Sequence, residues 1–515
     1  MELEFLSNDP ETLKNYSHDA SLFEMKPKWV ATPRNAEDIK SLVKFALEKG
    51  ETLTPRAGGS DMTGGPLSES IVVDVAKLNK IGEIREEGTQ VEPGVFYRDF
   101  ESKTLENNLL LPCYPASKNM AAIGGMVGNN CGGEKSLRYG KMEDFIVSSK
   151  WVFADGNEYT VSRAVLDNPY SEQVLKLIKE NEQIIRNAKP KVSKNSSGYY
   201  LWNVYPEPVE GLERIFDLNK LLVGSQGTLG IMTEATLRLV PTKPYHDLVV
   251  LFFKSWDQLP PVVDKILPFE PEDLETFDKA TIKMGLRLMP FTFATQFLSE
   301  AVIGVEMLGF PELVVLVEIA GENENEVKRK VRGVVDAIKP FEVWHQVVEQ
   351  DAKEEKFWKV RRESFNLLRK EMGGKKTAPF VDDFCVPVEA VPAFLPKAKV
   401  ILEKHDIHVN IAGHAGNGNF HIIPLMDLRQ ESEREKLIPV AEAFYDLVRD
   451  YKGTISGEHN DGLVRTPFLG KMYSPEVLEL FKKVKQIFDP EGIFNPKKKV
   501  GATIEDFKKY LTKYP

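Results

Sequence analysis

Three glycine-rich clusters in the first half of the chain limit what it can fold into. They are "GGSDMTGG" at 58–65, "IGGMVGNNCGG" at 123–133 and "GSQGTLG" at 224–230. Glycine lets a backbone approach a ligand closely, and its positive φ angles aim successive N–H groups at one anion. One cluster alone favours an ordinary turn. Three clusters at irregular spacing instead predict loops that share a bound anionic ligand, not a repeat protein.

The first cluster connects two predicted strands. Residues 36–49 have the apolar spacing of a helix that begins behind Asn35, and "TLTPRAGGSDMTGGPL" and "SIVVDVAKL" then indicate strand, loop and strand. The loop does not give the G-x-G-x-x-G pattern leading into a helix that Rossmann folds use. A nicotinamide cofactor is therefore disfavoured.

The pattern changes after Pro241. Further apolar segments predict strands mixed with helices, among them a helix near 388–404, and they lie at 247–253, 312–321, 380–386, 406–413 and 418–424. This mixture predicts an α+β protein whose later part is an antiparallel sheet with helices on one face. A last helix is expected at 475–488, with Ser474 as its cap.

The length and composition indicate a multidomain globular protein. At 515 residues the chain exceeds a single hydrophobic core, and we expect domains at 1–242 and 243–450 and a C-terminal segment with closing helices at 451–515. A net charge of −10 gives no general affinity for polyanions, so nucleic acid is not expected as a partner. No apolar run reaches a membrane span and the start lacks a signal peptide, which makes a cytoplasmic location the expectation.

The cysteines exclude two kinds of site. Only Cys113, Cys131 and Cys385 occur, too scattered for a disulfide framework or for an iron–sulfur cluster held by this chain. Any redox chemistry therefore needs another cofactor.

Histidines concentrate near the C-terminus and suggest a metal site. "GHAGNGNFH" at 413–421 places His414 and His421 seven positions apart, where a straight strand would point them to opposite sides. The glycine-rich bend between them permits convergence, and "SGEHNDG" offers the carboxylate of Glu458 as a further ligand. The alternative is that the pair serves as polar core or surface residues. His405 and His408 are expected to be surface or packing residues.

Taken together, "PRAGGSDMTGGPLSESIVVDVAKLNKI", "IGGMVGNNCGGEKSLRYG", "VGSQGTLGIMTEATLRLVP", "GHAGNGNFH" and "SGEHNDG" resemble the FAD-linked oxidase and dehydrogenase family with the vanillyl-alcohol oxidase fold. Its members include D-lactate, glycolate and D-2-hydroxyglutarate dehydrogenases. The resemblance implies a two-part PCMH-type FAD-binding domain followed by an antiparallel-sheet substrate, or cap, domain.

By this resemblance three groups of loop residues hold FAD. The first group binds the pyrophosphate through its backbone, the second lines the flavin, and the third closes over it. They are Arg56, Ala57, Gly58, Gly59, Ser60, Asp61, Thr63, Gly64 and Gly65; Pro115, Ala116, Ser117, Gly124, Gly125, Asn129, Asn130, Gly132, Gly133, Tyr139 and Gly140; and Gly227, Gly230 and Ile231. No histidine lies between His18 and His246, which implies non-covalent FAD.

The resemblance also assigns His414, His421 and Glu458 as metal ligands and His459 as the residue beside the substrate. Zinc is the expected metal, with manganese, iron and cobalt as alternatives. A metal-bound substrate hydroxyl could give its proton to His459 while hydride leaves for flavin N5. Family members usually have aspartate in place of Asn417 and commonly glycine in place of Asn460.

Arg361, in "FWKVRRESF", matches a family arginine in the substrate domain. Its guanidinium could hold a carboxylate in two parallel bonds, alone or with Arg362, and Arg465 is a second candidate cation. An exposed helical charge is the alternative for Arg361 and is favoured for Arg362.

The function expected from these features is oxidation of a small anionic D-2-hydroxyacid to the 2-oxo acid, with D-lactate, D-2-hydroxyglutarate or glycolate as the type of substrate. The alternative, motivated by Asn417 and Asn460, is a non-catalytic flavin-binding subunit of a larger dehydrogenase complex. We expect electrons to leave through a separate iron–sulfur or other electron-transfer partner, a quinone or oxygen. Such a partner could hold the protein at a membrane periphery, and a homodimer is left open.

Overall fold

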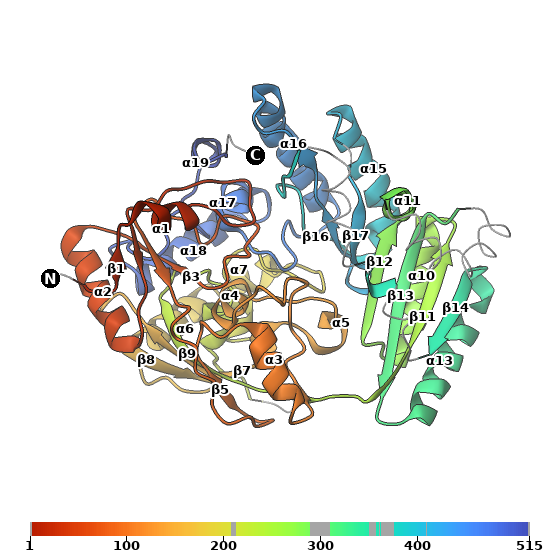
Figure 1. The fold of residues 1–515 in the computed structure, drawn as a ribbon, viewed down its shortest axis with the longest axis horizontal. Coiled ribbons are helices and arrows are strands. Elements are labelled where there is room, and N and C mark those ends of the chain that lie inside the picture. Colours follow the sequence, from red (N-terminus) through yellow and green to blue (C-terminus); the bar gives the residue numbers. More distant parts are fainter. Residues whose placement is uncertain are drawn as a thin grey trace.

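The computed structural model describes residues 3–207, 213–288, 310–349, 357–359, 361, 375–407 and 409–512. Two bodies lie side by side in it (Figure 1). The larger combines the first half of the chain with its C-terminal helices, and the smaller is built on a long sheet in the middle of the sequence. The hairpin with His414 and His421 belongs to the sheet of the smaller body, and the last part of the chain then returns to the larger body.

The first sheet of the larger body contains the predicted strand–loop–strand unit. Its order is β1-β2-β4-β3, with β1 antiparallel and the others parallel. Helix α2 (Ala36–Lys49) begins at Asn35, whose side chain accepts a hydrogen bond from the Asp38 N–H, and ends at Gly50 with φ 66°. The predicted helix is therefore confirmed. The strand bounds are Leu6–Ser7, Trp29–Ala31, Leu53–Arg56 and Ile71–Asp74 for β1 to β4.

The second sheet of the larger body is antiparallel and has the order β5-β9-β7-β8. These strands span Thr89–Val91 (β5), Ile231–Leu237 (β9), Ile146–Val152 (β7) and Glu158–Ser162 (β8). Besides α2, the first half of the chain forms the helices α1 (Pro10–Asn15), α3 (Tyr97–Leu105), α4 (Ile123–Asn129), α5 (Ser136–Tyr139), α6 (Pro169–Glu180), α7 (Glu182–Ala188), α8 (Leu201–Val204) and α9 (Asn219–Leu222).

The C-terminal segment returns to this larger body. Helix α18 (Pro475–Phe488) places Leu480, Phe481 and Val484 in the same apolar core as Tyr199. Its bounds match the prediction, but Ser474 occupies the cap position without a capping hydrogen bond from its side chain. The other helices of this part are α17 (Gly462–Arg465) and α19 (Ile504–Lys509).

In the described residues the smaller body holds a sheet of seven strands in the order β14-β11-β13-β12-β17-β18-β16. Every neighbouring pair is antiparallel, which confirms the predicted α+β class. The strands are β11 (Tyr245–Phe253), β12 (Asp273–Asp278), β13 (Leu313–Gly321), β14 (Trp344–Glu349), β16 (Phe384–Cys385), β17 (Ile411–His414) and β18 (Asn419–Ile422). Two short pairs, β6 (Leu109–Leu110) with β10 (Val240–Pro241) and β15 (Lys376–Thr377) with β19 (Leu425–Met426), complete the strands.

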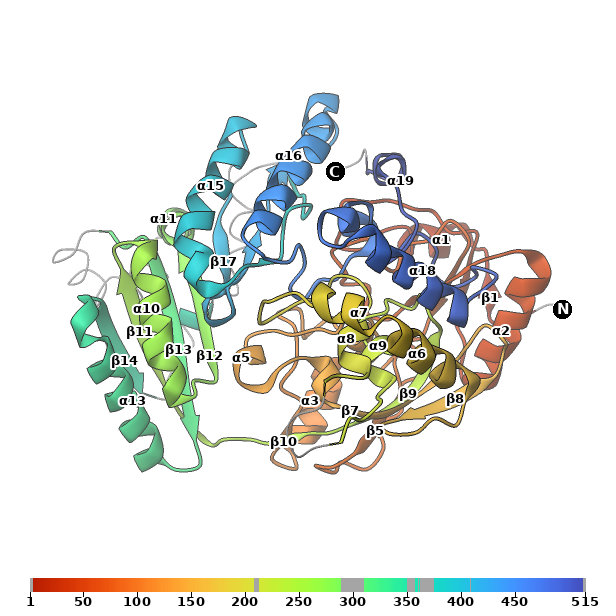
Figure 2. The same ribbon diagram turned by 180° about the vertical axis from the view of Figure 1, so that it is seen from behind.

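Helices α10 (Leu259–Ile266) and α13 (Glu324–Ile338) lie together against one face of this sheet (Figure 2). Its other face packs on Ile282 of α11 (Lys279–Leu288) and on Phe357 and Trp358. Burial on both faces explains why residues 248–253 of β11 are all apolar instead of alternating with polar residues. Helices α15 (Val391–Lys404) and α16 (Glu431–Asp450) pack on the apolar core beside β16. Within the described ranges, each helix is too short or too polar to form a bilayer-spanning segment.

Candidate functional site

The two histidines of "GHAGNGNFH" lie on adjacent antiparallel strands. His414 ends β17, His421 lies in β18, and the short helical turn Ala415–Asn417 with Gly418 at φ 66° joins them. The register pairs Ala412 with His421 and His414 with Asn419, so the two histidines occupy diagonal positions on one face of the hairpin. The predicted convergence is therefore confirmed.

The ring nitrogens of this pair meet the carboxylate of Glu458. His414 Nε2 lies 3.1 Å and His421 Nε2 3.3 Å from Glu458 Oε1, and the two Nε2 atoms are 3.5 Å apart. Ligand atoms bound to zinc at its usual distances are about 3.3–3.6 Å apart in a tetrahedral site. The triangle thus has the dimensions of three metal ligands, and its atoms are of the types that zinc and related ions prefer.

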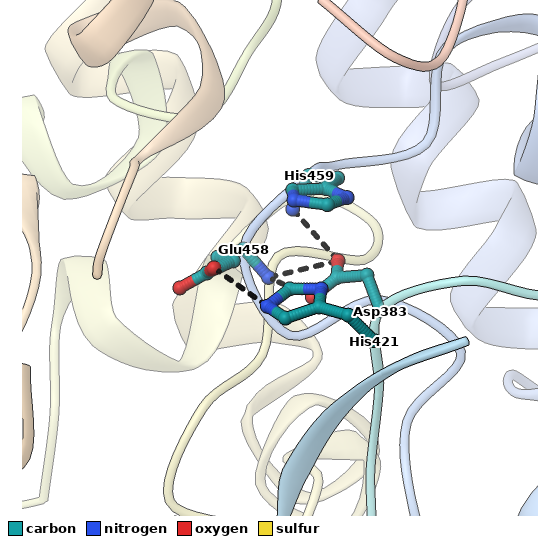
Figure 3. Close-up of side chains that lie close together, drawn as sticks. All are labelled: Asp383, His421, Glu458 and His459. Carbon is teal, nitrogen blue, oxygen red and sulfur yellow. Dashed lines mark hydrogen bonds and ion pairs between the residues drawn. The ribbon is translucent and has the colours of Figure 1, made fainter. Parts of the chain in front are cut away.

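Asp383 shapes the loop that carries Glu458. Its carboxylate accepts hydrogen bonds from the backbone N–H groups of Glu458 and His459 and from the Ser456 hydroxyl, as Figure 3 shows for the first two. Ligand atoms of Asp383, His421, Glu458 and His459 lie within 4.8 Å of one another. Because Asp383 is engaged with the backbone, the tighter triangle with His414 is the better metal-binding set.

Lys194 fixes the second oxygen of Glu458. Its Nζ lies 3.0 Å from Glu458 Oε2, and its side chain is only 1% exposed. Burial would raise the pKa of Glu458, but Lys194, His414 and His421 hold that pKa well below its usual value. Glu458 is therefore a carboxylate with one oxygen directed to Lys194 and the other to the two histidines.

Each histidine of the triangle has an acidic partner on its other ring nitrogen. His414 Nδ1 makes a close contact with Glu275 Oε1, and His421 Nδ1 lies 3.4 Å from Asp382 Oδ1. Such carboxylates commonly orient metal-binding histidines. Burial would lower the pKa of His421, yet Asp382 and Glu458 raise it to about 10. The site thus stabilises positive charge at the place where a divalent cation would supply it.

Glu275 also contacts Arg361, with Arg361 Nε 2.9 Å from Glu275 Oε2 and both side chains buried. Arg361 is thereby held next to His414, as part of the chain Arg361–Glu275–His414. The exposed-charge alternative for Arg361 does not apply, since the residue is 5% exposed. Arg362 and His408 lie outside the described residues.

One cavity of about 320 Å³ connects the histidine cluster with the glycine loops. Its wall includes Arg361, His414, His421, Glu458 and His459. The predicted FAD-binding residues on the same wall are Arg56, Ala57, Gly58, Gly59, Ser60, Asp61, Gly65, Pro115, Ala116, Ser117, Gly124, Gly125, Asn129, Gly132, Gly227, Gly230 and Ile231. The structure thus brings most of both predicted sites together.

Six predicted FAD-binding residues lie off this wall, and protein contacts account for several of them. Tyr139 donates its hydroxyl hydrogen bond to Glu272, and Asn130 donates its side-chain hydrogen bond to Glu143. Gly64 and Gly140 have φ angles of 77° and 83°, which glycine adopts without strain. The six are Thr63, Gly64, Asn130, Gly133, Tyr139 and Gly140.

The residues present fit a bound FAD. Arg56 Nη1 is buried and makes no hydrogen bond within the described residues, so it is available to an anion such as a pyrophosphate.

The glycines of the loops differ in what surrounds their Cα atoms. A Cβ on Gly58 would lie 2.1 Å from the Met120 carbonyl oxygen, which shows close packing between two loops. A Cβ on Gly125 would lie 3.6 Å from the Ala57 Cβ, an ordinary van der Waals distance. Gly125 lines the cavity, so this added atom would narrow the space for FAD without disturbing the packing of the loops.

Gly133, like Gly58, packs against a backbone carbonyl, whereas Gly125 does not. Alanine substitutions at Gly133 and Gly125 should therefore affect different quantities, the first stability and the second FAD binding. In Gly133→Ala, the new Cβ would lie 1.9 Å from the Tyr114 carbonyl oxygen, and we expect a loss of about 1–3 kcal/mol in the free energy of unfolding. Gly125→Ala should change that free energy by less than about 0.5 kcal/mol but weaken FAD binding. Urea denaturation of the FAD-free proteins and fluorescence titration with FAD measure both quantities. Equal stability losses would contradict the distinction.

Two residues that depart from the family pattern have structural roles. Asn460 has φ 72° and its amide donates hydrogen bonds to the carbonyls of Asn129 and Gly224. Asparagine tolerates this left-handed conformation better than most residues, which explains how it replaces glycine. Asn417 lies in the turn between the two histidine strands, and its main-chain carbonyl accepts a hydrogen bond from Ser193 Oγ.

Arg465 is not a substrate-binding cation, contrary to the expectation. Its guanidinium is fully buried and donates to the backbone carbonyls of Ile455, Asn460 and Asp382. It joins the loop of Glu458 to the segment before β16. His405 lies at the end of α15, away from the cluster, as expected.

Sequence reasoning missed four site residues: Lys194, Glu275, Asp382 and Asp383. The acidic pair in "FVDDFCV" was the one available signal, since adjacent carboxylates in an apolar strand are costly without partners. Lys194 and Glu275 lie on segments far from both histidines in sequence. Nothing local distinguishes them from surface charges.

The contact of Lys194 with Glu458 predicts a large stability effect. We expect Lys194→Met to lower the free energy of unfolding of the metal-free protein by about 3–5 kcal/mol, because it removes the lysine partner of the buried Glu458 carboxylate and leaves its Oε2 without that ion pair. The loss should shrink when a divalent metal is added. Lys28→Met, which breaks the exposed pair with Glu51, is the control and should cost no more than about 1 kcal/mol. Similar losses in both variants would contradict the prediction.

Comparisons with known proteins identify the family of this chain. The family model described as "FAD linked oxidases, C-terminal domain" matches residues 242–499, and the model described as "FAD binding domain" matches residues 27–162. D-2-hydroxyglutarate dehydrogenase of Haemophilus influenzae is 25% identical over 93% of this chain and 48% of its own length. The chain thus spans about half the length of that relative.

D-lactate dehydrogenase of Archaeoglobus fulgidus is 28% identical over 92% of this chain and 91% of its own length. Among solved structures, 4-ethylphenol oxidase from Gulosibacter chungangensis aligns with a TM-score of 0.70 at 17% identity, over 98% of this chain and 95% of that one. At this identity the structural likeness concerns the fold, which it shares over nearly the whole chain.

Proposed function

Because this chain belongs to the FAD-linked oxidases, we propose that it is an FAD- and divalent-metal-dependent oxidoreductase that converts a D-2-hydroxyacid to the 2-oxo acid. The observation that carries the proposal is the single cavity shared by the glycine loops, the His414–His421–Glu458 triangle and His459. A hydride acceptor and a Lewis acid would therefore meet one small substrate. The names of the two relatives, which act on D-2-hydroxyglutarate and D-lactate, support this substrate class.

His414, His421 and Glu458 would hold the metal, and the loops at 56–65, 115–132 and 227–231 would hold FAD. When bound, the metal supplies Lewis acidity at the substrate hydroxyl and FAD accepts the hydride. His459 takes the hydroxyl proton. Its Nδ1 lies 2.9 Å from Asp382 Oδ2, and the residue lines the cavity. Nε2 is therefore the ring nitrogen that would accept the proton.

Arg361 would receive the substrate carboxylate together with the metal. It lies on the cavity wall, and its link to Glu275 and His414 places its charge at the metal side of the cavity. With its carboxylate held by this guanidinium, a hydroxyacid would present its α-hydroxyl towards the side of the cavity lined by His459, and such two-point binding would favour one hand at the α-carbon.

The test begins with the metal and FAD content of the purified protein. Oxygen-free protein is then mixed with the D and L forms of lactate and 2-hydroxyglutarate and with glycolate, and loss of flavin absorbance is followed. We expect bleaching by a D acid and not by its L form. Full metal and FAD occupancy without bleaching by any acid would overturn the substrate assignment, and yellow protein that binds no metal would support the non-catalytic subunit instead.

The electron acceptor and the cytoplasmic location expected from the sequence stay predictions. Reoxidation of the bleached protein by oxygen, a soluble quinone or an iron–sulfur protein would identify the class of acceptor.

A further inference from the structure

We propose that Asp382 is a positioning residue that couples the metal site to the proton acceptor, because its one carboxylate holds both His421 and His459. Asp382 Oδ1 lies 3.4 Å from His421 Nδ1, and Asp382 Oδ2 lies 2.9 Å from His459 Nδ1. This inference rests on the proposed function, in which His421 binds the metal and His459 receives the substrate proton. No sequence feature connected Asp382 with either role.

The geometry fixes the orientation of both rings at once. The imidazoles of His421 and His459 stack with centroids 4.9 Å apart and an interplanar angle of 21°. Stacking presents the Nδ1 atoms of both rings to the same carboxylate, which is completely buried. The Nε2 atoms then serve two different purposes: that of His421 lies in the metal triangle, while His459 lines the cavity.

The shared carboxylate determines which ring nitrogens carry hydrogen. A neutral imidazole that donates its Nδ1–H to a carboxylate must have an unprotonated Nε2, which is the form required both of a metal ligand and of a base. Both Nδ1 atoms lie at ion-pair distance from the Asp382 carboxylate, which thereby favours hydrogen on Nδ1 in each ring.

The neighbouring residues Asp382 and Asp383 contact different parts of the site. Asp383 has φ 64°, and its carboxylate binds the backbone N–H groups of Glu458 and His459. The Asp382 carbonyl accepts a hydrogen bond from buried Arg465, at 2.6 Å from its Nη2. Asp383 therefore positions the main chain of the loop, and Asp382 positions the two rings.

The test is Asp382→Asn in the full-length, FAD-loaded protein. An amide keeps the shape but can accept from only one ring through its oxygen, while its NH₂ group forces the other ring into the wrong tautomer. We expect zinc affinity, measured by calorimetry on metal-stripped protein, to fall by about 10–100-fold. At saturating zinc, flavin reduction by the best hydroxyacid should still be at least about 100-fold slower, with little change in substrate half-saturation.

Glu275→Gln is the matched comparison, because Glu275 contacts the ligand His414 and not His459. Its zinc affinity should fall by a similar factor, but its rate loss at full zinc occupancy should be at least about 10-fold smaller than that of Asp382→Asn. Equal rate losses in the two variants, or an Asp382→Asn defect cured fully by zinc, would overturn the coupling. A parent protein that neither binds zinc nor bleaches with any hydroxyacid would overturn the proposed function instead.

A measurement on the parent protein covers the case in which Asp382→Asn does not fold. Nitrogen-15 NMR of histidine-labelled, zinc-loaded protein should show Nδ1–H tautomers for both His421 and His459. An Nε2–H signal for His459 would overturn the proposal.

Discussion

Replacing His459 by asparagine should slow flavin reduction by a 2-hydroxyacid at least about 100-fold, the usual scale for loss of a general base. His459 lines the cavity next to the metal triangle and is held through Nδ1 by Asp382, so its Nε2 is placed to accept the substrate proton. An asparagine side chain cannot accept that proton at neutral pH. The rate is measured by stopped-flow absorbance without oxygen.

The flavin spectrum and the metal content of His459→Asn should stay as in the parent, because His459 belongs to neither predicted ligand set. His405→Asn, at the end of α15, is the matched control and should reduce its flavin at the parent rate. An unchanged rate in His459→Asn would remove this residue from the mechanism. Loss of FAD in the variant would show that His459 supports the fold of the cavity.

Replacing His414 by alanine should remove the metal. His414 supplies one corner of a triangle whose sides are 3.1, 3.3 and 3.5 Å, so two ligands remain where three are needed. We expect zinc affinity to fall by more than the roughly 10–100-fold typical of residues that only support a ligand. Flavin reduction should fall with the metal content, measured by plasma emission spectroscopy.

A strong chelator should produce the same loss of activity in the parent protein, and added zinc, manganese or cobalt should restore it. Zinc at about 1,000 times its dissociation constant should also stabilise the parent by roughly 4 kcal/mol, and this gain should be absent in His414→Ala. Full activity after the chelator has removed the metal would contradict a metal-dependent reaction. Retained FAD in both samples shows that the two cofactor sites are separable.

Asn417 and Asn460, which differ from the family pattern, do not remove the contacts that support the two histidines. They are therefore weak evidence for a non-catalytic subunit. The acidic partners of the two histidines are Glu275 and Asp382, whereas the carbonyl of Asn417 accepts a hydrogen bond from Ser193. Asn460 meets the demand for a left-handed backbone and ties the histidine loop to the flavin-lining segment at Asn129.

The sequence by itself determined the local elements and the residues whose chemistry is unusual for their setting. Asn35 and Gly50 fixed the ends of α2 because capping depends on neighbouring residues alone, and the bend of "GHAGNGNFH" implied that His414 and His421 converge. Glycine clusters likewise marked the cavity loops, since few other residues permit such close backbone packing.

Only the tertiary structure decided which charged residues complete the site. Lys194, Glu275 and Asp382 come from three distant segments, and neither Lys194 nor Glu275 differs from a surface charge in its local sequence. The same limit explains Arg465, which was a second candidate cation for the substrate but whose guanidinium binds backbone carbonyls. The ionisation and function of a buried charged residue depend on the groups around it. Tertiary packing determines which groups those are.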